Sequence, residues 1–133
     1  MRLETILRIL IVAAIVLPIA GAVFDTVVPG LMPPELVAYS ESKLEEPLGV
    51  VGIVMAALVA PILISAIGLW LFKPWARWLY TAVTAAAYLL AVFDSPWVGS
   101  SMASLLADLA NLCDGAILAL IWFSDLRGRF ERP

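Results

Sequence analysis

The longest uncharged run of the chain reads PLGVVGIVMAALVAPILISAIGLWLF and covers residues 47–72. These 26 residues exceed the about 20 that an α-helix needs to cross the hydrocarbon core of a bilayer. The composition agrees, because 63% of the 133 residues are apolar and 14% are charged, whereas soluble domains have about 45–50% and about 25%. The run therefore indicates a membrane protein.

Three further runs complete the expected set of crossings. Two uncharged stretches of 16 residues, 9–24 and 78–93, are slightly short, but the long side chain of a flanking arginine can extend each span to the headgroups. A fourth run, residues 102–123, is mostly apolar but contains Asp108, Asn111 and Asp114. We expect one domain, residues 1–133, folded as an all-α integral membrane bundle of four antiparallel helices. The expected helices are Leu3–Phe24, Leu48–Phe72, Trp75–Phe93 and Met102–Phe123, with an outer loop at 25–47.

Basic residues indicate the orientation of these helices, because cytoplasmic loops of membrane proteins carry an excess of Lys and Arg. Seven of the eight basic residues would lie on one side of the membrane and Lys43 on the other. This split predicts that both termini face the cytoplasm, in a bacterial inner membrane. The seven residues are Arg2, Arg8, Lys73, Arg77, Arg127, Arg129 and Arg132.

Aromatic and basic residues between the second and third expected helices predict an anchor at the lipid interface. Aromatic rings favour headgroup depth, and cations there meet anionic lipid phosphates. The expected anchors are Lys73, Trp75, Arg77 and Trp78, and Trp70, Tyr80 and Trp122 would complete the inner aromatic belt, while Trp97 marks the outer one. The acidic residues expected to face outward are Asp25, Glu35, Glu41, Glu45, Glu46 and Asp94.

The outer loop, residues 25–47, is punctuated by prolines. Pro34 is expected to begin a short helix that continues to Glu46, because proline is favoured at the first position of a helix. Leu36, Val37 and Leu44 would let this helix rest on the membrane surface. The loop is expected to act either as a solvated connector or as a lid over a binding site.

The first helix has an alternative interpretation. Arg2, the apolar stretch that follows and Ala20-Gly21-Ala22 together resemble a secretory signal peptide with its cleavage site. Cleavage would leave three spans, whereas retention of this segment gives an even number of crossings.

Small residues recur along the second expected helix. Gly52, Ala56 and Ala60 follow one another at four-residue spacing and therefore share one helix face. Such a stripe lets a neighbouring backbone approach closely, which promotes helix association in lipid. The stripe is expected either to pack inside the bundle or to form a dimer. Pro61 is expected to bend the same helix.

Polar residues of the fourth expected helix also form a stripe, at three- and four-residue steps. It consists of Ser101, Ser104, Asp108, Asn111 and Gly115, with Asp114 at its edge. The preceding helix carries Thr81, Thr84 and Tyr88. If the two helices are antiparallel neighbours, a rise of ~1.5 Å per residue matches their depths. We therefore predict contacts of Tyr88 with Asp108, and of Thr81 and Thr84 with Asn111 and Asp114.

The two aspartates of this polar cluster have no basic residue inside the expected spans to balance them. An isolated carboxylate is costly in hydrocarbon, which favours its neutral form. Three arrangements remain open: neutral and hydrogen-bonded carboxyls, carboxylates that line a wet cavity, or carboxylates that meet a cation or a partner's basic group. Ionisable groups inside a membrane are candidate functional residues, and polar contact between helices is the structural alternative.

The composition excludes several classes of site. With no His and one Cys, Cys113, the chain lacks the residues for a His- or Cys-based metal site, a His-dependent catalytic pair or an internal disulfide. We therefore expect no metal, no cofactor and a buried, inert Cys113. A net charge of −3 and a pI near 4.7 argue against nucleic acid as a partner.

Two patterns resemble known membrane proteins. Asn111-Leu112-Cys113-Asp114 resembles the N-x-x-D pattern of the lipoprotein signal peptidase, which takes a second aspartate from another helix. No aspartate lies at matching depth on another expected helix, and Asp108 and Asp114 are ~9 Å and ~120° apart on their own helix. The segments LWLFKPWARWLY (69–80) and DGAILALIWFSDL (114–126) resemble small bacterial inner-membrane proteins with four helices.

Three functions remain open from these residues. The first is a non-enzymatic membrane protein that binds a hydrophobic ligand or serves as a subunit or scaffold of a membrane complex. The second is a proton- or cation-translocating unit that uses the acidic residues of the fourth helix. The third is an intramembrane aspartyl enzyme. The expected partners are the lipid bilayer and either further copies of the chain or another membrane protein.

Overall fold

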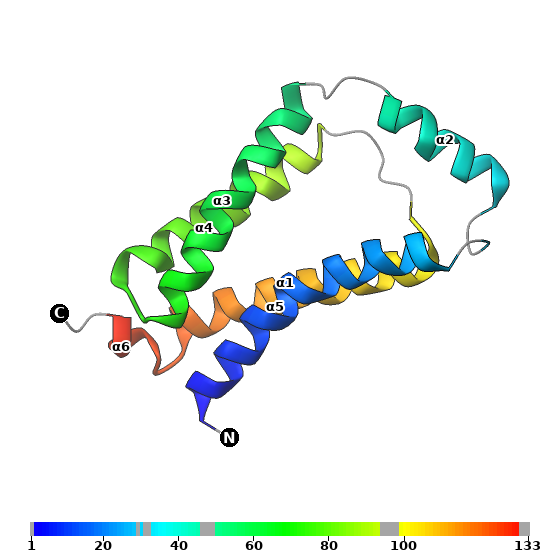
Figure 1. Ribbon diagram of the computed structural model, residues 1–133. Helices are drawn as coiled ribbons and strands as arrows, with labels where there is room; N and C mark the ends of the chain where they lie inside the picture. Colours follow the sequence, from blue (N-terminus) through cyan, green and yellow to red (C-terminus); the bar gives the residue numbers. More distant parts are fainter. Residues whose placement is uncertain (1, 29, 31–32, 46–49, 94–98, 131–133) are drawn as a thin grey trace.

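The computed structural model describes residues 2–28, 30, 33–45, 50–93 and 99–130. Within these ranges the chain is all-α, as the sequence predicts, and the predicted short helix after Pro34 is present (Figure 1). The helices are α1 (Leu3–Val27), α2 (Pro34–Glu45), α3 (Val50–Trp70), α4 (Pro74–Ala91), α5 (Ser101–Phe123) and α6 (Arg127–Phe130).

Three of these helices are long and apolar enough to cross a membrane. They are α1, residues Gly52–Trp70 of α3, and α5, and they indicate a multi-pass membrane protein. The fourth expected crossing falls on α4, which has 18 residues, begins at Pro74 and contains Arg77 near its start. The described part of the chain therefore holds three candidate spans where the sequence predicted four.

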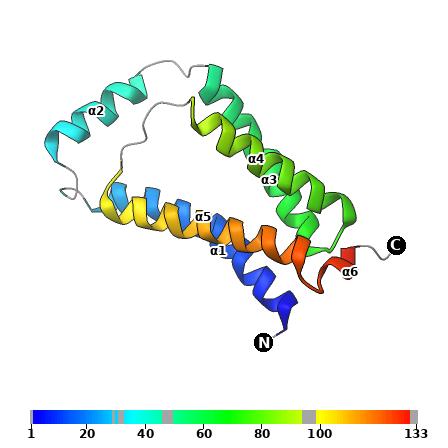
Figure 2. The same cartoon turned by 180° about the vertical axis from the view of Figure 1, so that it is seen from behind.

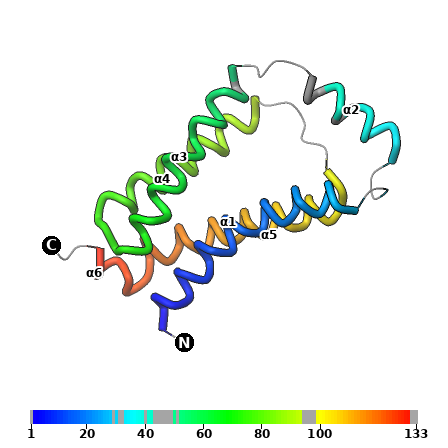
Figure 3. The backbone as a smooth tube through the Cα atoms, viewed as in Figure 1, coloured from blue at the N-terminus to red at the C-terminus, as the bar shows by residue number. Residues whose placement is uncertain are grey.

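The four long helices pack as two antiparallel pairs. Helix α1 lies along α5, and α3 lies along α4, as two opposite views show (Figures 1 and 2). The backbone trace in Figure 3 shows that the pairs meet at one end and diverge toward the other, where α2 lies. We call these the closed end and the open end.

The pairing of α5 differs from the prediction that α4 is its main neighbour. Helix α5 packs along α1, and its contacts with α4 are few. A Cβ at Gly21 would lie 3.3 Å from the Ala103 Cα, so glycine permits close approach of α1 and α5. Asp25 accepts hydrogen bonds from the hydroxyl and the backbone N–H of Ser100, the N-cap of α5. These contacts join the two helices at the open end.

A tight turn joins α3 to α4. The N–H of Lys73 donates to the Gly68 carbonyl at 2.9 Å, and the N–H of Phe72 donates to the Leu69 carbonyl at 3.1 Å. This pattern is a Schellman motif, with Phe72 in the left-handed region at φ 54°. Pro74 then begins α4. The turn therefore folds α4 back along α3.

Gly68 brings α3 and α4 close together beside this turn. A Cβ at Gly68 would lie 2.6 Å from the Ala76 Cβ and 2.8 Å from the Trp75 ring. The small-residue stripe predicted for packing is placed differently, because Ala56 and Ala60 are exposed and Gly52 is half-buried. Its second predicted role, in a dimer, stays a prediction.

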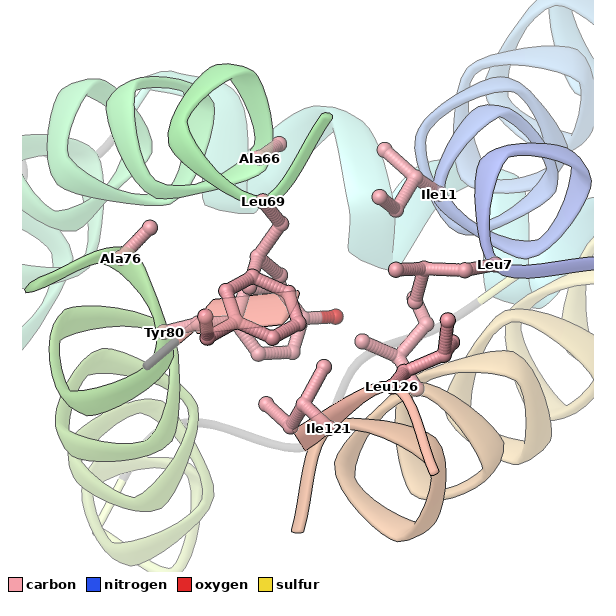
Figure 4. Packing of buried hydrophobic residues seen from close by; sticks show 10 residues of the cluster. Leu7, Ile11, Ala66, Leu69, Ala76, Tyr80, Ile121 and Leu126 are labelled. Atoms are coloured by element: carbon pink, nitrogen blue, oxygen red, sulfur yellow. The ribbon is translucent and has the colours of Figure 1, made fainter. Parts of the chain in front are cut away.

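Apolar residues from both helix pairs form the core at the closed end. Figure 4 shows Tyr80 of α4 between Leu69 of α3 and Ile121 of α5, with Leu7 and Ile11 of α1 beside them. The core thus joins the pairs where they meet. It consists of Leu7, Ile11, Ala66, Leu69, Ala76, Tyr80, Ile117, Ile121, Leu126 and Phe130.

Basic residues gather at the closed end, with aromatic rings as neighbours. The Arg8 guanidinium lies 5.1 Å from the centroid of the Trp70 ring, and Arg129 forms a 2.5 Å ion pair with Glu4. Segments far apart in sequence therefore place their cations together.

Arg77 departs from its predicted role as a headgroup anchor. It is 7% exposed, and its guanidinium lies over the Trp122 ring at 4.7 Å. An aromatic face attracts a guanidinium and replaces part of its hydration. The other predicted anchors, Lys73, Trp75 and Trp78, are exposed.

Some predictions fall outside the described residues. These concern Glu46, Asp94, Trp97 and Arg132 and the predicted start of the second crossing at Leu48.

Candidate functional site

A cavity of about 310 Å³ lies between α3, α4 and α5, on the side where the helix pairs diverge. Met55 and Ile62 of α3 and Ala87 and Ala91 of α4 supply its apolar lining. Its polar lining comes from α4 and α5. We call this site the polar pocket, and its polar residues are Tyr80, Thr84, Tyr88, Asn111 and Asp114.

A hydrogen bond between α4 and α5 forms one side of the polar pocket. The Tyr80 hydroxyl donates to Asp114 Oδ1 at 2.5 Å. Tyr80 is 4% exposed and belongs to the core, so its ring is held by packing while its hydroxyl reaches the carboxyl group. Asp114 lies two residues beyond Leu112, the central residue of α5, which is ~3 Å along the axis. The carboxyl group is therefore close to the middle of a candidate span.

A second hydrogen bond lies nearer the open end. The Tyr88 hydroxyl and the Asn111 Oδ1 are 3.0 Å apart, and the hydroxyl donates. Both residues are exposed. Tyr88 therefore pairs with Asn111 and not with Asp108 as predicted. The helix pairs diverge, so α4 contacts α5 nearer the closed end than it would if the two helices packed side by side along their whole length.

One face of α4 positions its polar pocket residues. Tyr80, Thr84 and Tyr88 are spaced by four residues and therefore lie along one stripe of the helix. Thr84 is 8% exposed and lies between the two tyrosines in this stripe. The three side chains line the polar pocket from successive turns.

Two members of the predicted cluster lie outside the polar pocket. The Thr81 hydroxyl accepts a 2.9 Å hydrogen bond from the Trp122 Nε1–H and donates to the Arg77 carbonyl at 2.8 Å. Asp108 is exposed and does not line the cavity. Thr81 thus serves the contact between α4 and α5 at the closed end, and the two aspartates differ in their surroundings.

The residue that sequence reasoning missed is Tyr80, which the pattern assigned to the interfacial aromatic belt. Its spacing of four from Thr84 and eight from Tyr88 was the available signal. The choice between Tyr80 and the adjacent Thr81 depends on the rotation of α4 about its axis. Packing of Tyr80 in the core decides that rotation.

The chemistry of the polar pocket favours binding. Its apolar walls suit a hydrophobic group, while the carboxyl group of Asp114, the side-chain amide of Asn111 and the hydroxyl of Thr84 offer hydrogen-bond donors and acceptors. Among the described residues of the lining, Asp114 is the one acidic residue, whereas an aspartyl dyad needs two carboxyl groups that share a proton. Over the described ranges, no group of three or more Cys, Asp or Glu side chains is placed to hold a metal ion.

Comparison of the chain with known proteins identifies no family. Neither a protein-family model, nor a curated protein, nor a solved structure matches it.

Proposed function

We propose that this chain is a non-enzymatic, multi-pass membrane protein that binds a hydrophobic molecule in the polar pocket. The molecule would place its apolar part against Met55, Ile62 and Ala87 and a hydrogen-bonding group against Asp114. One observation carries the proposal: a cavity of about 310 Å³ combines apolar walls with a carboxyl group near the middle of a candidate span.

The volume suits this class of ligand. Pockets for small molecules usually measure about 300–1,000 Å³ and are mostly apolar, with a few polar groups that orient the ligand. Tyr80 already donates to Asp114 Oδ1, and a carboxyl group has a second oxygen that can bond a ligand. A hydroxyl, amide or amine on an otherwise apolar molecule would satisfy that oxygen.

We further propose that α4 is a fourth crossing and that both termini lie in the cytoplasm of a bacterial inner membrane. Helix α4 runs antiparallel along α3, so it returns through the thickness that α3 crosses. The gathering of Arg8, Lys73 and Arg129 at the closed end supports this orientation, because an excess of basic residues is typical of the cytoplasmic side.

The binding proposal is tested by comparing two matched aspartate variants. The full chain, Asp114→Asn and Asp108→Asn are purified in mild detergent, and copurifying small molecules are extracted and quantified by mass spectrometry. We expect Asp114→Asn to retain at least about fivefold less of the copurifying molecule than the unaltered chain, since an unsatisfied buried polar group costs about 1–3 kcal/mol. Asp108→Asn should retain the full amount, because Asp108 lies outside the polar pocket.

A steric pair of variants tests the same site without changing its polarity. Ala87→Phe would fill the polar pocket, whereas Ala85→Phe adds the same ring at an exposed position outside its lining. Loss of the copurifying molecule from both variants, or from neither, would contradict the proposal. A bare protein with no copurifying molecule would contradict it as well.

Transport of protons or cations is the second candidate, and the same carboxyl group favours it. Asp114 faces a cavity and carries no cationic partner among the described residues, and such groups mark ion paths in membrane proteins. In liposomes, a proton or sodium flux that disappears in Asp114→Asn and persists in Asp108→Asn would support transport. Equal flux in all three proteins would remove it.

A further inference from the structure

A second hollow lies outside the polar pocket and shares no residue with it. It is a groove of about 400 Å³ along α1, closed on one side by Trp70 at the end of α3. Apolar side chains form most of its length, and Arg8 lies toward its start. The described lining thus has a cationic end and an apolar remainder.

The apolar part of the groove is one continuous stripe of α1. Ile9, Val12, Ala13 and Val16 follow at spacings of three and four residues, which places them on one helix face. From Arg8 to Leu17 the stripe spans nine residue-to-residue steps, or ~14 Å along the helix. One leaflet contributes about 15 Å, half of a hydrocarbon core about 30 Å thick. The groove is therefore about as long as one acyl chain in its leaflet.

The charged end is held in place by aromatic rings. The Arg8 guanidinium lies 5.1 Å from the Trp70 centroid and 5.9 Å from the Phe72 centroid. Stacked guanidinium groups still donate hydrogen bonds in their own plane. Within the described residues, Arg129 forms an ion pair with Glu4, which leaves the Arg8 guanidinium with its aromatic neighbours. Arg8 is exposed, and the hydroxyl of Thr5 is one turn away.

We propose that this groove binds one anionic phospholipid, with its phosphate against Arg8 and Thr5 and an acyl chain along Ile9–Leu17. Charge complementarity selects an anionic headgroup, and basic pockets between membrane helices bind such headgroups. The lining of the groove along α1 ends at Leu17, about one leaflet's depth from Arg8, which suits an acyl chain. Trp70 covers one side of the proposed acyl chain near Arg8, and tryptophan is favoured at the membrane–water interface.

Native mass spectrometry of the full chain in detergent tests this site. Phosphatidylglycerol and phosphatidylcholine with identical acyl chains are titrated separately, and the first bound lipid is quantified. We expect phosphatidylglycerol to bind about fivefold more tightly, the ratio that corresponds to ~1 kcal/mol for one basic residue at the membrane surface. Arg8→Gln should remove this preference, and Arg8→Lys should keep part of it.

Matched controls distinguish specific lipid binding in the groove from nonspecific effects of surface charge and hydrophobicity. Arg127→Gln removes an exposed cation of α6 at the same end, outside the groove, and should leave the preference unchanged. Ala13→Leu fills the groove and should weaken the binding of both lipids. Ala20 is exposed and lies outside the groove, so Ala20→Leu should not weaken their binding. The proposal would be overturned by equal affinity for the two lipids or by an equal effect of Arg127→Gln and Arg8→Gln. A dimer in place of the lipid adduct would overturn it as well. Failure of the polar pocket experiment would leave this result unaffected, because the two sites share no residue.

Discussion

The two aspartates of α5 both belong to the predicted polar cluster but have different surroundings in the structure. Asp114 receives a hydrogen bond from Tyr80 and lines a cavity, whereas Asp108 is exposed. They are separated by six residues, which turns them by ~120° about the helix axis. Within the described part of the chain, the Asp114 carboxyl group therefore has a hydrogen-bond partner, Tyr80, whereas Asp108 has none.

Removing the Tyr80 hydroxyl should destabilise the fold measurably. We expect Tyr80→Phe to lower the free energy of unfolding by about 0.5–1.5 kcal/mol, the range seen for hydrogen bonds between membrane helices. Tyr88→Phe is the matched control and should cost less, because Tyr88 is 47% exposed. Unfolding in mixed detergent micelles, followed by tryptophan fluorescence, measures both. A larger loss for Tyr88→Phe would contradict the expectation that the Tyr80–Asp114 hydrogen bond stabilises the fold more than the Tyr88–Asn111 hydrogen bond.

At the level of helices, glycine at particular positions permits close packing. Gly68 faces Ala76 and Trp75 across the α3–α4 contact, and Gly21 faces Ala103 across the α1–α5 contact. The regular stripe at Gly52, Ala56 and Ala60 was the stronger sequence signal, yet it is not where these close approaches occur. Spacing identifies a face that permits close packing, but the partner helix decides which face is used.

Gly68 and Gly115 give a paired test, because a Cβ would be crowded at the first and free of contacts at the second. Gly68→Ala should cost about 1–3 kcal/mol, because its Cβ would lie 2.6 Å from the Ala76 Cβ and force α3 and α4 apart. Gly115→Ala has nothing within 4 Å of its Cβ, and should gain up to about 1 kcal/mol from helix propensity. Thermal unfolding in detergent by circular dichroism measures both. Equal stability of Gly68→Ala and the unaltered chain would contradict the α3–α4 contact.

For the whole molecule, the distribution of charge between the two ends is the main feature. Arg8 contacts rings of α3 and the turn, and Arg129 binds Glu4 near the start of α1. The closed end thus combines cations from segments at opposite ends of the chain. The open end is joined by Asp25 and Ser100. This asymmetry supports the proposed orientation and can be tested directly.

Cysteine labelling tests both the orientation and the fourth crossing. In a Cys113→Ser background, Arg2→Cys and Lys73→Cys should react with a membrane-impermeant maleimide only after the cells are lysed. Ser42→Cys and Phe93→Cys should react from the outer face of the inner membrane. Labelling of Phe93→Cys from the same side as Lys73→Cys would show that α4 does not cross. Labelling of Arg2→Cys from the outer face would reverse the orientation.

Much of the polar pocket could be predicted from residue types and spacing. Thr84, Tyr88, Asn111 and Asp114 were expected to lie together because polar groups in lipid need partners, and all four line the cavity. Tyr80 was missed and Asp108 was misplaced, because one residue of helix rotation, ~100°, separates a pocket position from its neighbour. That rotation depends on core packing at the closed end.

The local sequence determined the helices, because long apolar runs bury their backbone polar groups in the bilayer only by becoming helical. It also determined the short helix after Pro34, since proline is suited to the first helical position. Only the tertiary structure decided that α5 packs along α1 and that the two helix pairs diverge around a cavity. Helix partners in lipid are selected by close packing at points such as Gly21 and Gly68, and that complementarity depends on two surfaces at once.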